Sequence, residues 1–335
     1  MQQKQEGADD IRNLVFQSNP DFEKIALDIF RLQYNNNIVY KNYVDALKVN
    51  ISQVDKTTAI PFLPIRFFKT HQVMTGNFSP DLIFESSGTT QTINSKHLVK
   101  DAGIYEESFF SCFERFYGNV KDWCVLGLLP SYLERKHSSL VYMVQQLIEK
   151  SGHEKSGFYL YDFKQLADAL IALEKQGQKT LLIGVTFALL DFAEQYKLPL
   201  HNTIVMETGG MKGRRQEMIR NEVHDILKDA FLLDAIHSEY GMSELLSQAY
   251  SSGNGIFQSP PWMRILLRDE EDPLTIKNSE TNKVRGLINV IDLANIHSCS
   301  FIATDDLGAL YTDGSFEVTG RMDNSDLRGC SLMVL

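Results

Sequence analysis

The chain has 335 residues, of which 43% are hydrophobic and 23% are charged, which is the profile of an ordinary globular protein. Its 33 basic and 43 acidic side chains give a formal charge of −10, which disfavours nucleic acid or an anionic membrane surface as the main partner. The polar N-terminus lacks the apolar segment of a signal peptide, and no run of about 18 apolar residues predicts a membrane span. The four cysteines form no CxxC motif, so we expect a cytoplasmic protein with reduced thiols.

The first third of the chain predicts helices, an ordered loop and one strand. "FEKIALDIFRLQYNN" has helical apolar spacing, and "YKNYVDAL" continues it. "IPFLPIRFFKTHQV" contains two prolines and is typical of an ordered loop. "DLIFESSGTT" predicts a short strand that ends in a polar turn. The segment from His97 to Gly118, "HLVKDAGIYEESFFSCFERFYG", predicts one long helix with a glycine stop.

The next part of the chain alternates between predicted strands and helices. Strands are expected in "DWCVLGLLP", "KTLLIGV" and "HNTIVMETGG". Helices are expected in "SLVYMVQQLIEKSG", "FKQLADALIALEKQGQ", "TFALLDFAEQY" and "RRQEMIRNEVHDILKDAF". This alternation predicts an α/β fold with a mostly parallel sheet covered by helices on both faces. After Ser259, turns and runs such as "GLINVIDL" predict a smaller, more antiparallel region.

Three polar turns follow predicted strands, at the edge of a parallel sheet where ligands gather. They are "ESSGTT" at 85–90, "ETGGMKGR" at 207–214 and "HSEYGMSE" at 237–244, and a fourth polar segment runs from Thr304 to Asn324. In "SSGTT", hydroxyls and backbone N–H groups can surround a phosphate, and Gly88 permits close approach of the backbone. The alternative is a Ser/Thr-rich surface turn, because the glycine and lysine spacing of the common phosphate loop is absent.

The other polar turns also allow two interpretations each. In "YGMSE", Tyr240 is suited to stack on a base and Glu244 to bind Mg²⁺, which prefers oxygen ligands. The alternative is a turn that caps a helix through Ser243 and Glu244. "TDDLG" offers two carboxylates for a ribose diol or a metal, or it is a solvated acidic turn.

The order of the four segments resembles the adenylate-forming superfamily of acyl-CoA synthetases, luciferases and peptide-synthetase adenylation domains. That superfamily shows "SSGTTG", "YGxTE", "TGDLG" and "GRxDD" in this order. Here the matching stretches are "SSGTTQ", "YGMSE", "TDDLG" and "GRMDN", and the resemblance spans about residue 62 to the C-terminus. "PFLPIRFFKTH", "LLPSYLERKHSSLVYMV", "ETGGMKGR" and "GRMDNSDLRGC" are further similar to its LuxE-type acyl-protein synthetase branch.

The resemblance implies an activity that uses ATP and Mg²⁺ to activate a carboxylic acid, by this branch a fatty acid, as an acyl-adenylate. The acyl group then passes to a cysteine or to a partner protein, a reductase or a carrier protein. The alternatives are an acyl- or aryl-CoA ligase, an acyltransferase of a biosynthetic cluster, and a non-catalytic nucleotide-binding or partner-binding homologue. The resemblance also implies a domain at 1–318 and a hinge or C-terminal stub at 319–335, with the C-terminal lobe largely absent.

Site residues follow from the resemblance by position. The residues implied to hold the ATP phosphates are Ser86, Ser87, Gly88, Thr89 and Thr90. The residues implied to contact the rest of the nucleotide are Gly209, Gly210 and Tyr240 at the adenine, Gly241 beside them, Ser243 at the α-phosphate and Asp306 at the ribose. Glu244 is implied to bind the Mg²⁺. Arg321 matches the arginine that lies next to the hinge in the superfamily.

The sequence departs from the superfamily's pattern where the phosphate loop ends. Gln91 replaces a glycine, and the usual lysine spacing is changed, so Lys96 or His97 is the candidate for the missing charge. Asp305 replaces the glycine of "TGDLG" and adds a carboxylate beside the expected ribose site. The lysine of the superfamily's C-terminal lobe also has no counterpart in the sequence.

Two further residues are candidates for the acyl group. Cys330, within "LRGCSLMVL", matches the cysteine near the C-terminus through which the branch passes its acyl group, and Arg328 would favour its thiolate. The alternative is a small packed hydrophobe, the common fate of a free cysteine. His137 is a weaker candidate for the acyl pocket, the alternative being an ordinary surface or core histidine. Cys112 and Cys124 lie in apolar segments and are expected in the core.

Overall fold

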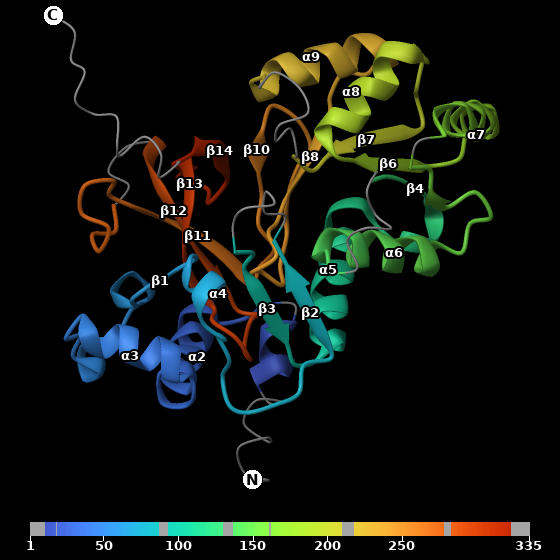
Figure 1. The fold of residues 1–335 in the computed structure, drawn as a ribbon. Coiled ribbons are helices and arrows are strands. Elements are labelled where there is room, and N and C mark those ends of the chain that lie inside the picture. The colour runs from blue at the N-terminus through green and yellow to red at the C-terminus, as the bar shows by residue number, and fades with distance from the viewer. Residues whose placement is uncertain are drawn as a thin grey trace, which may run out of the picture. The chain divides into compact units, whose positions relative to one another are not determined.

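The computed structural model describes residues 11–17, 19–86, 93–129, 137–160, 162–209, 218–277 and 283–322. The chain forms two compact units (Figure 1). Unit 1 consists of Met1–Asp81, Thr90–Lys100 and Pro261–Leu335. Unit 2 consists of Leu82–Thr89 and Asp101–Pro260.

A largely parallel sheet forms the centre of unit 2, with the strand order β5–β4–β6–β7–β8–β9. Neighbouring strands pair in parallel, except that β8 and β9 are antiparallel. Every residue of β4 and β6 is buried, which explains why these segments read as continuous apolar runs in the sequence. The strands are β4 (Cys124–Leu128), β5 (Gly157–Phe158), β6 (Thr180–Gly184), β7 (Thr203–Glu207), β8 (His237–Tyr240) and β9 (Ala249–Ser251).

Helices cover both faces of this sheet. They are α5 (Ala102–Tyr117), α6 (Ser139–Ser151), α7 (Phe163–Gln176), α8 (Thr186–Gln195) and α9 (Arg220–Phe231). Figure 1 shows α8 and α9 on one side of the strands and α5 and α6 on the other. Leucines and phenylalanines of α7, α8 and α9 form one apolar core with side chains of β4, β6 and β7. Unit 2 also contains the short strands β2 (Leu82–Glu85) and β10 (Ile256–Phe257).

Capping residues set the ends of the helices as the sequence predicts. The Asp101 carboxylate accepts a hydrogen bond from the Gly103 N–H at the start of α5, and Asp162 does the same for the Gln165 N–H at the start of α7. Gly152 and Gly177 end α6 and α7 in the left-handed region, with φ of 63° and 66°.

The predicted first residue is wrong for two helices, α5 and α9. The predicted helix from His97 begins only at Ala102, because residues 96–99 form the strand β3 and Asp101 caps the helix after it. The predicted helix from Arg214 begins at Arg220, where the Glu222 carboxylate accepts a hydrogen bond from the Ile219 N–H and fixes the first turn. The other predicted helices and strands are confirmed within about two residues.

An antiparallel sheet forms the centre of unit 1, with the order β14–β13–β12–β11, and β1 pairs in parallel with β13. The strands of unit 1, whether in this sheet or outside it, are β1 (Leu63–Pro64), β3 (Lys96–Val99), β11 (Met263–Arg268), β12 (Lys283–Asp292), β13 (Phe301–Tyr311) and β14 (Phe316–Arg321). Of these, β3 lies outside the sheet. The helices are α2 (Phe22–Asn36), α3 (Ile38–Ala46) and α4 (Phe67–Thr70), with 3₁₀ turns at Ile51–Gln53 and Thr57–Ala59. The predicted α/β fold with a smaller antiparallel region is therefore confirmed.

Aromatic and amide contacts hold α2 and α3 to the strands of unit 1. The Phe301 ring stacks on Tyr40 at 6.1 Å between centroids and meets Phe30 edge-on at 6.2 Å. The buried Gln33 amide donates hydrogen bonds to the carbonyls of Asn295 and Ile296. These contacts bury α2 residues that the sequence places at helical spacing.

The predicted division at residue 318 falls within β14 and stays a prediction. Among the described residues, no helix is long and apolar enough to cross a membrane.

Candidate nucleotide-binding site

Two of the predicted turns meet in unit 2, at the end of β2. The Ser243 hydroxyl, in the "YGMSE" turn, donates a hydrogen bond of 3.2 Å to the Glu85 carbonyl. Ser86 follows directly and is partly buried. The other predicted phosphate contacts, Ser87, Gly88, Thr89 and Thr90, lie outside the described residues. The structure thus places Ser243 against the start of the Ser/Thr-rich loop.

His137 lies beside the same strand. Its carbonyl accepts a hydrogen bond of 2.8 Å from the Glu85 N–H, and its Nδ1 is 3.1 Å from the Ile83 carbonyl, to which it donates. The side chain is exposed. The described contacts of His137 support the end of β2, and its predicted place at an acyl pocket stays a prediction.

The "YGMSE" segment begins with the last residue of β8, and its two end residues are buried. Tyr240 is 8% exposed, and its ring lies 5.9 Å from Phe257. Glu244 is 6% exposed. A Cβ at Gly241 would meet the Glu239 carboxylate, so that side chain would have to shift.

Glu239 is a carboxyl group that the sequence analysis did not single out. Burial raises its pKa to about 8, and the negative charge of Glu207 adds to the shift. Nearby, the buried Gln248 Oε1 has no hydrogen-bond partner among the described residues. Its position next to Tyr240 is the only local signal for this carboxyl, because its neighbours Tyr250 and Cys112 come from β9 and α5.

The Gly209 turn at the end of β7 is held by backbone and side-chain bonds. The Gly209 N–H donates to Glu207 Oε2 at 2.8 Å, and the Gly209 carbonyl accepts from the Thr186 N–H at 3.0 Å. Its φ of 72° lies in the left-handed region, which favours glycine. Gly210 lies outside the described residues. The turn that the resemblance assigns to adenine therefore has both polar groups of Gly209 engaged.

Glu207 is itself surrounded by charge partners from α9. Its Oε1 lies 3.5 Å from Arg220 Nε and 3.7 Å from His224 Nε2. Burial raises its pKa, but the hydrogen bond from His224, the Arg220 charge and the hydrogen bonds from Ser238 and Gly209 outweigh it and bring the pKa to about 2. The sequence analysis missed Arg220 and His224, although their spacing of four residues places them on one helix face.

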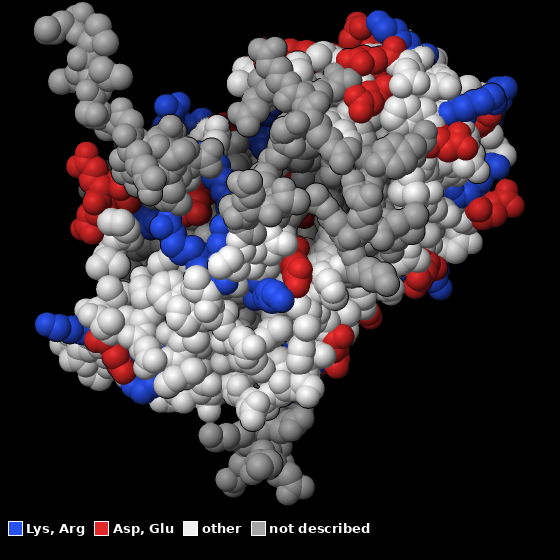
Figure 2. Space-filling view, in the orientation of Figure 1, with Lys and Arg blue, Asp and Glu red and all other residues white. Residues whose placement is uncertain are grey.

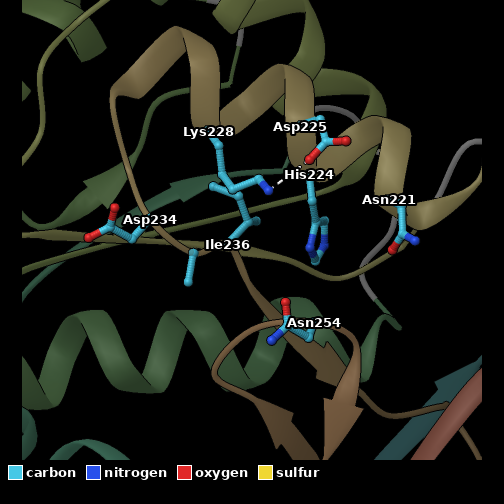
Figure 3. A pocket seen from close by; sticks show the side chains of 8 residues that line it. Asn221, His224, Asp225, Lys228, Asp234, Ile236 and Asn254 are labelled. Carbon is cyan, nitrogen blue, oxygen red and sulfur yellow. Dashed lines mark ion pairs between the residues drawn. The ribbon is translucent and has the colours of Figure 1, made fainter.

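His224 also lines a polar pocket of about 320 Å³ (Figure 3). Its lining comes from α9, the segment before β8 and the turn after β9, and comprises Asn221, His224, Asp225, Lys228, Asp234, Ala235, Ile236 and Asn254. The ammonium of Lys228 pairs with the Asp225 carboxylate at 2.7 Å. None of the residues predicted for the site lines this pocket.

Unit 1 carries the remaining predicted residues on β13 and β14. Asp306 and Arg321 are directly opposite each other in the ladder, with Arg321 Nε 3.8 Å from Asp306 Oδ1. The Arg321 side chain is 50% exposed and that of Asp306 is 15% exposed. The neighbouring Asp305 pairs with Arg66 at 3.5 Å. Asp305 and Asp306 have different partners because successive side chains of a strand point to opposite faces of the sheet.

The two candidates for the missing phosphate-loop charge differ in exposure. Lys96 is exposed at the start of β3. His97 is 1% exposed, with its Nε2 3.0 Å from Asn295 Oδ1 and its ring edge-on to Phe68 at 5.8 Å. This packing favours Lys96 over His97 as the cation available to a ligand.

Three cysteines are buried and the fourth is not described. Cys112, Cys124 and Cys299 are all 0% exposed, which confirms the core position expected for the first two. Burial raises the pKa of Cys124 to about 11 and that of Cys299 to about 12, so neither is a thiolate at neutral pH. Cys330 lies outside the described residues.

The described part of the chain contains no preformed metal cluster. No group of three or more His, Cys, Asp and Glu side chains is arranged there to hold a metal ion. A cation that bridges phosphate oxygens needs only one or two protein carboxylates, and the buried Glu244 fits that requirement. Figure 2 shows acidic and basic side chains interspersed over the surface of unit 2.

Comparison with solved structures shows a fold similar to that of two larger proteins. 2-Hydroxyisobutyryl-CoA ligase in its post-adenylation state aligns with a TM-score of 0.59 at 12% identity, over 90% of this chain and 68% of the ligase. ATP-bound MatB from Rhodopseudomonas palustris aligns with a TM-score of 0.54 at 15% identity, over 73% of this chain. The match covers 49% of MatB, so the chain spans about half the length of that enzyme.

No protein-family model matches the sequence, and no curated protein matches it. The similarity to these two solved structures is therefore one of fold, at identities of 12% and 15%. The LuxE-type branch and the assignment of individual site residues remain predictions from the sequence.

Proposed function

We propose that the protein activates a carboxylic acid with ATP and transfers the acyl group to a cysteine or to a partner protein. The observation that carries the proposal is the contact of Ser243 with the carbonyl of Glu85, the residue directly before the Ser/Thr-rich loop. This contact joins two of the four ordered motifs within unit 2, and the fold of the chain is similar to that of 2-hydroxyisobutyryl-CoA ligase. By the resemblance, the acid is a fatty acid.

In the first step, a carboxylate oxygen of the acid bonds to the α-phosphorus of ATP. The bond from that phosphorus to the bridging oxygen breaks, and pyrophosphate leaves with the electron pair. Because this displacement depends on positioning and charge neutralisation, hydroxyl and N–H donors serve it without a strong protein acid or base.

We propose each role from the resemblance, residue by residue. The loop that begins at Ser86 binds phosphates, the Gly209 turn and Tyr240 flank the adenine, and Ser243 contacts the α-phosphate. Mg²⁺, held by Glu244, would neutralise phosphate charge. Asp306 binds the ribose diol, with Arg321 beside it.

In the second step, a thiolate attacks the carbonyl carbon of the acyl-adenylate, and AMP leaves with the bonding electron pair. The three described cysteines are buried, so the proposed carrier is Cys330. Substitution of Cys330 by serine should preserve adenylation and abolish the thioester adduct detected by mass spectrometry. The same adduct in the Cys330→Ser variant would rule out this residue as the carrier.

Acid-dependent exchange of pyrophosphate into ATP tests the first step. We expect exchange only when Mg²⁺ and a suitable acid are both present. Absence of exchange across a panel of fatty and aromatic acids would contradict the proposal. Product analysis with CoA, with acyl carrier protein and with neither then separates a CoA ligase from an acyl-protein synthetase.

A further inference from the structure

Two buried or half-buried carboxylates hold the two ends of β7. At the carboxyl end, Glu207 Oε2 accepts hydrogen bonds from the Gly209 N–H and from the Thr186 hydroxyl, at 2.8 and 3.1 Å. At the amino end, Glu174 of α7 accepts from the N–H groups of His201 and Asn202, at 2.9 and 3.1 Å. Only the first of these carboxylates faces a turn that the proposed function assigns to the nucleotide.

The surroundings of Glu207 suit a fixed anchor. The side chain is 7% exposed, and Arg220 and His224 of α9 face its second oxygen. Burial raises the carboxyl pKa, but these partners lower it to about 2, so the group is ionised at neutral pH. An ionised acceptor makes a stronger hydrogen bond to a backbone N–H than a neutral one does. The Gly209 turn is thus tied to α9 through a single carboxylate.

We propose that Glu207 is a positioning residue that fixes the Gly209 turn in the shape that accepts the base of ATP. This inference rests on the proposed function, in which that turn flanks the adenine. A turn whose N–H and carbonyl are already engaged does not have to be ordered when the nucleotide binds. Ordering costs reduce affinity, so a preorganised turn strengthens nucleotide binding more than it changes the chemical step.

Substitution of Glu207 by glutamine keeps the size of the side chain and removes its charge. One amide oxygen can still accept from Gly209, but the ionic contacts with Arg220 and His224 are lost. We expect the Kd for ATP, measured by calorimetry without acid substrate, to rise about tenfold or more. In pyrophosphate exchange, we expect KM for ATP to rise by a similar factor, while kcat at saturating ATP changes less than about threefold.

The matched control is Glu174→Gln, at the opposite end of the same strand. Glu174 also accepts backbone hydrogen bonds. Burial raises its pKa, but the hydrogen bonds from the Thr203 hydroxyl and from those N–H groups together outweigh burial and lower the pKa. Its loss should reduce the stability of unit 2 without a change in the Kd for ATP. A second variant, Arg220→Gln, leaves the hydrogen bond from Gly209 to Glu207 in place. Because the Arg220 side chain is 30% exposed, this variant is expected to fold more readily than Glu207→Gln. We expect a smaller rise in Kd from it, in the same direction.

The outcomes separate the inference from the proposed function. If the wild-type protein binds ATP and Glu207→Gln binds it equally well, the positioning role is wrong and the proposed function stands. If Glu207→Gln and Glu174→Gln lose affinity alike, in proportion to their lost thermal stability, Glu207 is only structural and the inference is again overturned. If the wild-type protein binds no ATP, the proposed function fails and the inference fails with it. If Glu207→Gln does not fold, an unchanged Kd in Arg220→Gln overturns the inference.

Discussion

The two units hold their candidate site residues in different surroundings. In unit 2, polar turns follow β7 and β8, and both Glu207 and Glu244 are less than 10% exposed. In unit 1, Asp306 and Arg321 face each other across antiparallel strands, and half of the Arg321 side chain is exposed. Buried charge partners are costly to disrupt, whereas exposed pairs contribute little to stability. Substitutions in unit 2 should therefore change stability and activity together, and those in unit 1 activity alone.

The largest effect is expected from Glu244→Gln in unit 2. Loss of the carboxylate removes the proposed ligand of Mg²⁺, so the rate of pyrophosphate exchange should fall at least about a hundredfold. Glu149→Gln removes one charge from the exposed face of α6 and serves as the control. Its rate of pyrophosphate exchange should equal the wild-type rate. An active Glu244→Gln protein would remove this residue from the mechanism.

Two carboxyl groups of unit 2 predict opposite dependences of stability on pH. The folded pKa of Glu239 is raised from 4.5 to about 8 by burial, so the unfolded chain ionises first and stability falls as pH rises through this range. The folded pKa of Glu207 is lowered from 4.5 to about 2, so its contribution is lost only as pH falls through that range.

Glu239→Gln therefore should increase the free energy of unfolding at pH 8 by on the order of 3 kcal/mol relative to wild type, and by much less at pH 4.5. Urea denaturation at the two pH values measures this difference. An equal effect of the substitution at both values would show that the charge of Glu239 is not the cause.

In unit 1, Asp306→Asn should weaken nucleotide binding without destabilising the fold. A neutral amide binds a ribose diol less well than a carboxylate does, so KM for ATP should rise about tenfold. The free energy of unfolding should change by less than about 1 kcal/mol, because the ion pair with Arg321 is partly exposed. Asp313→Asn, in the exposed turn before β14, should change neither quantity much. A large loss of stability in Asp306→Asn would remove the contrast between the units.

The smallest effect on stability is expected from Arg321→Gln. The separation of 3.8 Å and the 50% exposure of the arginine predict a loss of less than about 0.5 kcal/mol. Thermal unfolding at low and high salt measures it, and a loss above about 2 kcal/mol would mean that the pair behaves as a buried one.

Local signals in the sequence predict most of the fold. Buried runs such as "TLLIG" and apolar spacing such as that of "FKQLADALIALEKQGQ" are local, and they predict β6 and α7 well. The start of α5 was misplaced because "KHLV" has no local signal against a helix, and its strand conformation depends on tertiary contacts.

The candidate site is less predictable from the sequence, because its support comes from distant elements. The turn motifs name Ser243 and Gly209, but nothing in them indicates the Glu85 carbonyl or the His224 ring as partners. Glu207 itself could be read as the first residue of "ETGG", yet its partners in α8 and α9 emerge only from the fold. Likewise, the buried position of His97 depends on Asn295, which lies 198 residues further along the chain.

Transfer of oxygen from the acid to AMP tests the central claim most directly. When a carboxylic acid labelled with oxygen-18 is incubated with the protein, Mg²⁺ and ATP, attack on the α-phosphorus leaves one acid oxygen in the phosphate of the released AMP. The proposal predicts labelled AMP and unlabelled pyrophosphate by mass spectrometry. Unlabelled AMP, or label in inorganic phosphate, would contradict acid activation through an acyl-adenylate.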